Sequence, residues 1–116
     1  MRKTVLYILA LAGAVGIAPA ALGQSGTYYY CYAYESGGNR VWISNSLKFV
    51  SDWEEKDATH RNWVRTVRAQ TGESYFSATG CRPPWDSSDS GAVEDDRLSM
   101  VDNERGYGKS VVFLSW

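Results

Sequence analysis

The segment TYYYCYAYE, residues 27–35, has the side-chain pattern of a β-strand. Aromatic residues favour strands, and successive side chains of a strand point to opposite faces. Tyr29, Cys31 and Ala33 would share one face, and the other face would consist of tyrosine alone. The four tyrosines of that face are Tyr28, Tyr30, Tyr32 and Tyr34. An aromatic surface of this size either lies beneath another element or serves for binding.

The N-terminal segment has the composition of a secretory signal peptide. A short basic start precedes an apolar run over residues 5–17, which is too short to span a membrane, and small residues follow it. We expect the signal peptide to comprise residues 1–23, with a cut after Ala20 as the alternative. The short basic start indicates a bacterial protein that is exported to the periplasm or out of the cell.

Cleavage would leave residues 24–116, the length of one small domain, with no second apolar span to hold it in a membrane. Loss of Arg2 and Lys3 reduces the twelve basic residues to ten, against thirteen acidic residues, so the net charge would be −3. A domain that binds phosphate backbones is normally basic. Nucleic acid is therefore not an expected partner.

Two cysteines, Cys31 and Cys81, lie in the expected mature chain. In an oxidising compartment they predict one disulfide, and only one intramolecular pairing exists. Closure of so long a loop contributes about 4 kcal/mol to stability in the chain-entropy treatment. We interpret the bond as structural, because no C-x-x-C motif is present to make a reactive thiolate.

Turn and capping signals divide the mature chain into six elements. Ser36, Gly37, Gly38 and Asn39 predict a tight turn between two strands. The sequence from Ser51 to Glu54 has the form of a capping box. The expected strands are residues 28–34, 40–45, 73–80 and 109–116, and the expected helices are residues 51–70 and 92–105.

Helical spacing predicts which helix side chains point inward. In the first helix the inward stripe comprises Trp53, His60, Val64 and Val67, with Trp63 at its edge. Three arginines line another face of this helix, namely Arg61, Arg65 and Arg68. In the second helix the inward residues are expected to be Val93, Leu98 and Val101.

The fold class that follows is a small α+β two-layer sandwich with element order β-β-α-β-α-β. We expect a mainly antiparallel four-stranded sheet with both helices on one face and one disulfide. If the helices cover Cys31 and Ala33, the core is completed by Val41, Ile43, Phe76 and Ala78. The other face would then be open and would present the four tyrosines with Trp42 and Tyr75.

Two points of this arrangement stay open. Cys81 has the alternation parity of Tyr75 rather than that of Phe76, so either Gly80 forms a bulge or the face assignment of that strand is reversed. Alternatively, the tyrosines lie beneath a helix or loop with their hydroxyls hydrogen-bonded.

No residue set matches a catalytic or metal-binding signature. His60 is the one histidine and lies on the predicted inward stripe, where packing is the expected role. A calcium loop that begins at Asp86 would place Arg97 where a bidentate glutamate is required. The segment from Gly106 to Ser110 lacks the first glycine of a phosphate-binding loop and precedes an apolar strand. We therefore assign no catalytic residue, metal ligand or cofactor.

The function expected from the sequence is binding without catalysis. Tyrosine and tryptophan provide rigid contact area, so the expected partner is an extracytoplasmic protein or a second copy of the chain. A glycan-binding module is one alternative, since aromatic rings stack on sugars. A small cell-envelope hydrolase that uses His60 or the acidic residues near Trp85 is another. The candidate binding residues are Tyr28, Tyr30, Tyr32, Tyr34, Trp42, Tyr75 and Trp85.

Overall fold

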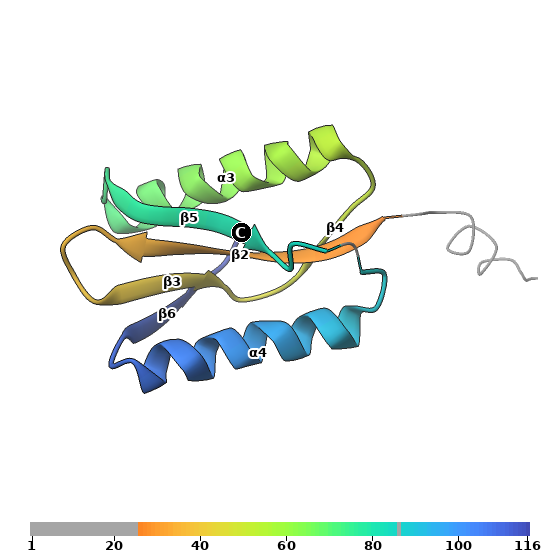
Figure 1. The fold of residues 1–116 in the computed structure, drawn as a ribbon. Helices are drawn as coiled ribbons and strands as arrows, with labels where there is room; N and C mark the ends of the chain where they lie inside the picture. The colour runs from red at the N-terminus through yellow and green to blue at the C-terminus, as the bar shows by residue number, and fades with distance from the viewer. Residues whose placement is uncertain (1–25, 86) are drawn as a thin grey trace, which may run out of the picture.

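The computed structural model describes residues 26–85 and 87–116 (Figure 1). The expected signal peptide lies outside the described residues. The elements, in chain order, are β2 (Thr27–Glu35), β3 (Arg40–Ser44), β4 (Lys48–Val50), α3 (Trp53–Thr71), β5 (Phe76–Arg82), α4 (Ser90–Gly106) and β6 (Ser110–Leu114). The α+β class is confirmed. The expected element order lacked β4, a strand of three residues that carries too short a pattern to be recognised.

The sheet is mixed and is built around β2. Strand β2 pairs antiparallel with β5 on one side and with β3 and β4 on the other, whereas β6 pairs with β3 in parallel. In the described part of the chain the sheet thus has five strands. The expected number of four strands is wrong. Most of the pairings are antiparallel, as expected, but the parallel pairing of β6 with β3 makes the sheet mixed.

The two helices cover opposite faces of the sheet, with α3 above and α4 below in Figure 1. Trp63 and Val67 of α3 pack on the face with Cys31, Ala33 and Trp42. The residues of the opposite face and of α4 that form the second core cluster are Tyr30, Val41, Ile43, Val93, Met100 and Val101. The expectation that both helices lie on one face is therefore wrong. Because both faces of β2 are apolar or aromatic, each requires its own cover.

The register of β5 explains the parity of Cys81. Cys31 lies directly opposite Cys81, and the expected disulfide joins them. Further along, Tyr34 is opposite Ala78 but Glu35 is opposite Phe76, so the extra residue is Ser77. The alternation thus breaks at Ser77 and not at the glycine. This bulge returns Phe76 to the face of the disulfide.

Gly80 has a different role, which depends on its lack of a side chain. A Cβ atom at Gly80 would lie 2.6 Å from the hydroxyl oxygen of Tyr32, its cross-strand partner. Glycine at this position therefore makes room for the Tyr32 ring.

Local signals set the ends of α3. The Asp52 side chain accepts a hydrogen bond from the Glu55 amide, and the Glu55 carboxylate accepts one from the Ser51 amide in return. The capping interaction thus begins one residue later than the sequence pattern indicated. At the other end Gly72 has a φ of 77° and its amide donates to the Arg68 carbonyl, as expected of a glycine that terminates a helix.

Candidate ligand-binding groove

The tyrosine face of β2 lies beneath α4. Tyr30 is completely buried, and the other three tyrosines of that face are partly buried. Trp42 is also buried, but on the α3 side. Tyr75 and Trp85 are exposed, at 79% and 54% respectively. The structure therefore does not bring the seven candidate residues together on one open surface. It places the four tyrosines of that face beneath a helix, as in the alternative interpretation.

Two tyrosine hydroxyls hold α4 against the sheet. Tyr30 donates a hydrogen bond to the Asp96 carboxylate, and Tyr34 donates to the Glu104 carboxylate at 2.6 Å. Arg82 lies near Asp96, with 3.6 Å between its Nε and the carboxylate oxygen. The pKa values of Tyr30 and Tyr34 are raised well above the usual value. Burial is the main cause, and the hydrogen bonds to these carboxylates raise the pKa values further.

Alkaline pH is expected to destabilise the protein through these two tyrosines. In the unfolded chain tyrosine ionises near pH 10.0, whereas Tyr30 and Tyr34 ionise at higher pH in the folded state. The unfolded chain therefore loses protons first, and the free energy of unfolding falls as the pH rises above 10. Urea denaturation across this range should show a shallower loss for Tyr30→Phe than for the wild type. The exposed variant Tyr75→Phe is the control, and equal slopes for Tyr30→Phe and the wild type would contradict the assignment.

The most exposed tryptophan of the described chain stands at the start of α3, and it separates two hollows. Trp53 is 80% exposed and contributes to both. The first hollow, of about 340 Å³, lies between the start of β2 and the start of α3. The second, of about 530 Å³, lies between α3 and the disulfide. We call the two hollows with the intervening indole the Trp53 groove.

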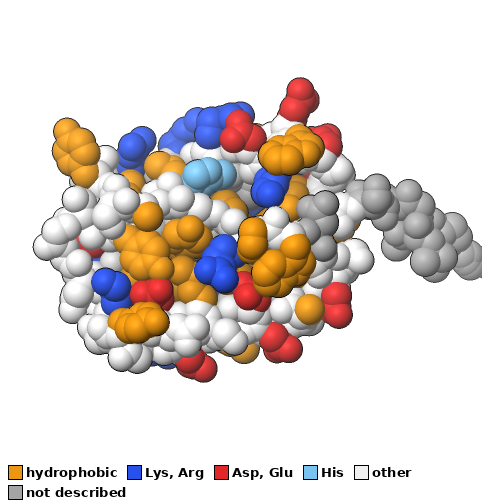
Figure 2. Space-filling model, in the orientation of Figure 1, with side chains coloured by type: hydrophobic (Ala, Val, Ile, Leu, Met, Phe, Trp, Pro, Cys, Tyr) orange, Lys and Arg blue, Asp and Glu red, His pale blue; other side chains and the backbone are white. Residues whose placement is uncertain are grey.

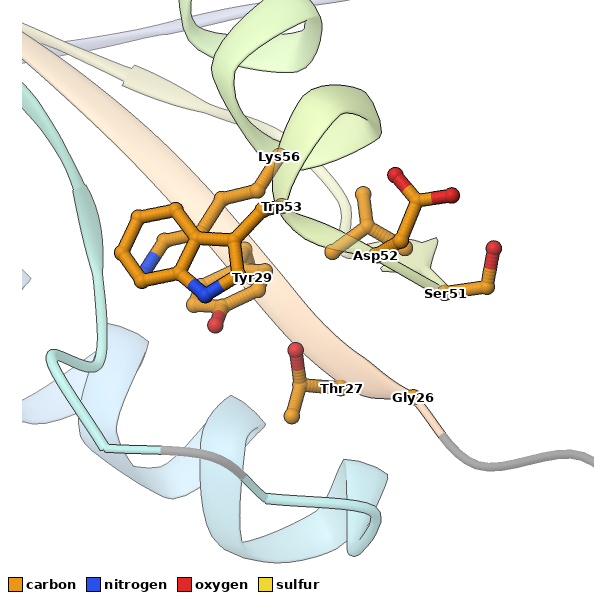
Figure 3. A pocket seen from close by; sticks show the side chains of 8 residues that line it. Gly26, Thr27, Tyr29, Ser51, Asp52, Trp53 and Lys56 are labelled. Atoms are coloured by element: carbon orange, nitrogen blue, oxygen red, sulfur yellow. The ribbon is translucent and has the colours of Figure 1, made fainter.

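Lys56 lies beside Trp53 and is also shared by both hollows. Its ammonium is 4.7 Å from the centre of the buried Tyr29 ring and 5.2 Å from that of Trp53. Both distances are within the range of cation–π attraction. In Figure 3 the three side chains stand together, with Ser51 and Asp52 across the first hollow. A positive charge is thus held next to an exposed indole.

Polar groups line the rest of the groove. The first hollow offers the hydroxyls of Thr27 and Ser51 and the carboxylate of Asp52. The second offers the carboxylates of Glu54 and Asp57. Asp57 is paired with Arg61 one turn along the helix. The groove therefore combines one exposed indole with donors and acceptors on both sides, a composition suited to ligand recognition.

His60 lines the second hollow together with Cys81. The imidazole Nε2 is 3.0 Å from the Thr79 hydroxyl, which connects α3 to β5. Across residues 26–85 and 87–116 the imidazole has no further hydrogen bond, and no group of three or more His, Cys, Asp or Glu could hold a metal ion. His60 therefore forms a contact between helix α3 and strand β5.

Figure 2 shows hydrophobic side chains gathered over β5 and β2, below the imidazole in pale blue. Lysine and arginine side chains line the outer side of α3. The three arginines predicted there are exposed. Arg65 bonds the Asn62 side chain, and Arg68 lies over the Phe76 ring. The arginines thus interact mainly with their own helix and its neighbour.

Sequence reasoning missed Trp53 because it assigned this residue to the inward stripe. The helical spacing from Trp53 to His60 and Val67 is real, but Trp53 is the first residue of α3. A side chain in the first turn can project past the end of the sheet. The sequence signal that could have separated the exposed Trp53 from the buried Trp63 is the start of the helix, which Asp52 marks.

None of the helices in the described segments is both long and apolar enough to cross a membrane. The Trp53 groove, the buried tyrosines and the disulfide belong to a small α+β domain, and the groove lies at the start of α3. Comparison of the chain with protein-family models, with curated proteins and with solved structures found no match.

Proposed function

We propose that the protein is an exported binding domain that holds its ligand in the Trp53 groove. The observation that carries the proposal is an indole that is 80% exposed between two hollows. A large aromatic side chain left in water contributes little to folding, so its position at a concave site favours a role in recognition.

The surroundings of the groove are suited to binding without rearrangement. Trp53 stands on the first turn of a helix of 19 residues, and the capping bonds of Asp52 and Glu55 fix that turn. The second hollow is bounded by Cys81, which the disulfide ties to β2. A site built on such elements loses little conformational entropy when it binds.

An extracytoplasmic protein is the first candidate ligand. Exposed tryptophans are the residues that most often dominate the energy of a protein interface. Lys56 beside the indole would add an attraction for an acidic segment. The segment would have to be narrow, because the groove crosses only the first turns of α3.

A glycan is the second candidate, and the polar lining favours it. The exposed part of the indole offers a surface for the apolar side of a sugar ring. The hydroxyls of Thr27 and Ser51 and the carboxylates of Asp52 and Glu54 stand on either side of it. These groups could accept and donate hydrogen bonds to sugar hydroxyls.

Trp53→Ala is expected to weaken binding strongly while the fold stays intact. The truncation of an interface tryptophan costs about 2 kcal/mol or more, so affinity should fall about thirtyfold or more. The immobilised protein would be exposed to an extract of secreted and periplasmic proteins, and bound partners would be identified by mass spectrometry. Soluble cell-wall polysaccharides would be titrated separately by calorimetry, because Trp53→Ala removes the fluorophore at the site.

Tyr75→Ala is the matched control, because Tyr75 is as exposed as Trp53 but does not line the groove. A ligand retained by Tyr75→Ala and lost by Trp53→Ala would support the proposal. A ligand that binds both variants equally would place the site elsewhere, and the exposed Trp85 would be the next residue to replace.

A further inference from the structure

The strands at the edges of the sheet differ in how they are protected against pairing with other chains. Strand β5 is interrupted by the bulge at Ser77, and β4 is only three residues long and begins with Lys48. Bulges, short length and lysine are common means by which proteins prevent edge strands from pairing. Strand β6, residues 110–114, has none of them: its sequence SVVFL contains no charge, no proline and no register shift.

Two residues of β6 direct their backbone amide and carbonyl groups away from β3, towards the outer side of the sheet. The Ser110 amide donates to Asn39, and the Leu114 carbonyl accepts from Asn45. Because alternate residues of a strand bond to the same neighbour, Ser110, Val112 and Leu114 face β3. The amides and carbonyls of Val111 and Phe113 therefore face outward. Among the described strands β6 pairs with β3 alone.

The side chains at this edge leave an apolar surface. Phe113 is 43% exposed, and the Arg97 guanidinium lies 5.6 Å from the centre of its ring. The chain that follows turns away from the edge, since the Trp116 indole nitrogen donates to Ser46 and the Ser115 carbonyl accepts from Gln70.

We propose that β6 is a dimerisation strand that pairs antiparallel with β6 of a second copy of the chain. The outward groups belong to two residues placed symmetrically about Val112. If the two Val112 residues face each other on a two-fold axis, Val111 lies opposite the partner's Phe113 and can exchange two hydrogen bonds with it. The same pair recurs on the other side of the axis, as an isologous interface requires.

The charges at the ends of the strand are compatible with this register. Lys109 would lie opposite the partner's Ser115, so the two lysines would not face each other. The Lys109 ammonium is in any case 5.9 Å from the centre of the Tyr34 ring. Pairing would join the two sheets into one continuous sheet and cover Phe113.

Amide hydrogen exchange by NMR tests the interface directly. The sample is the exported protein, obtained by expression of the full chain. In the dimer the Val111 and Phe113 amides should be protected, and their protection should decrease on dilution. The Val112 amide, which faces β3, should be protected at all concentrations. Protection of Val111 and Phe113 in a sample that sediments as a monomer would overturn the proposal, because another part of the same chain would then cover the edge.

Phe113→Lys, measured by sedimentation equilibrium, is the companion test. Lysine on an edge strand opposes pairing, so the dimer dissociation constant should rise at least about tenfold. Tyr75→Lys is the matched control, because it introduces the same charge at an exposed aromatic residue away from β6. A wild type that stays monomeric up to millimolar concentration, or a dimer unaffected by Phe113→Lys, would overturn the proposal.

Discussion

Replacing Trp63 with alanine is expected to lower the free energy of unfolding by about 3 to 5 kcal/mol. Trp63 is completely buried between α3 and the sheet, and its ring packs edge-on against that of Trp116. Truncation would remove the largest fully buried side chain of the described residues and leave a cavity. Urea denaturation followed by circular dichroism would measure the loss.

Trp53→Ala provides the comparison on the same helix. Trp53 is mostly exposed, so its truncation should change the free energy of unfolding by no more than about 0.5 kcal/mol. Trp63→Phe should cost less than Trp63→Ala, because it keeps a ring and removes an indole N–H that is buried without a hydrogen-bond partner in the described part of the chain. Similar losses for Trp53→Ala and Trp63→Ala would contradict the orientation of α3.

Removal of the disulfide is expected to have an effect of similar size. Cys31 and Cys81 are 50 residues apart in sequence, and closure of such a loop stabilises the folded state by about 4 kcal/mol in the chain-entropy treatment. For a domain of this size the double variant Cys31→Ala/Cys81→Ala should melt roughly 15 to 30 °C lower than the oxidised protein. Calorimetry of the two proteins would measure the difference.

Addition of a thiol reductant supplies the control for the disulfide experiment. It should lower the melting temperature of the wild type towards that of the double variant and should leave the double variant unchanged. If the double variant melts within a few degrees of the oxidised wild type, the disulfide does not reduce the conformational entropy of the unfolded chain as expected. The single variants are less informative, since each leaves one unpaired thiol.

The elements of the fold were largely predictable because their signals are local. The alternation in residues 27–35 identified β2, and Gly72 marked the end of α3 within two residues. In α4 the sequence placed Val93 and Val101 inward, as found, but also Leu98, which is exposed. Arg97 occupies a buried position of that helix instead. Its guanidinium bonds the Ser44 carbonyl and Glu94, which no apolar spacing predicts.

The candidate site was less predictable, because exposure depends on the distant parts of the chain. The tyrosines of β2 were considered for an open surface, but α4 covers them, and its partners of Tyr30 and Tyr34 lie 66 and 70 residues later in the sequence. Trp53 was placed in the core, although it is 80% exposed at the start of α3. In both cases the sequence identified an aromatic residue and its secondary structure but not its neighbours.

The sequence by itself determined the α+β class, the disulfide, the main strands and helices and which side chains of β2 share a face. Periodicity and capping are set by residues a few positions apart, so a single chain records them. The tertiary structure alone decided that α3 and α4 lie on opposite faces, that β6 runs parallel to β3 and that Trp53 remains in solvent. These features follow from which apolar surfaces meet over long sequence separations, and both faces of β2 were apolar enough to receive a helix.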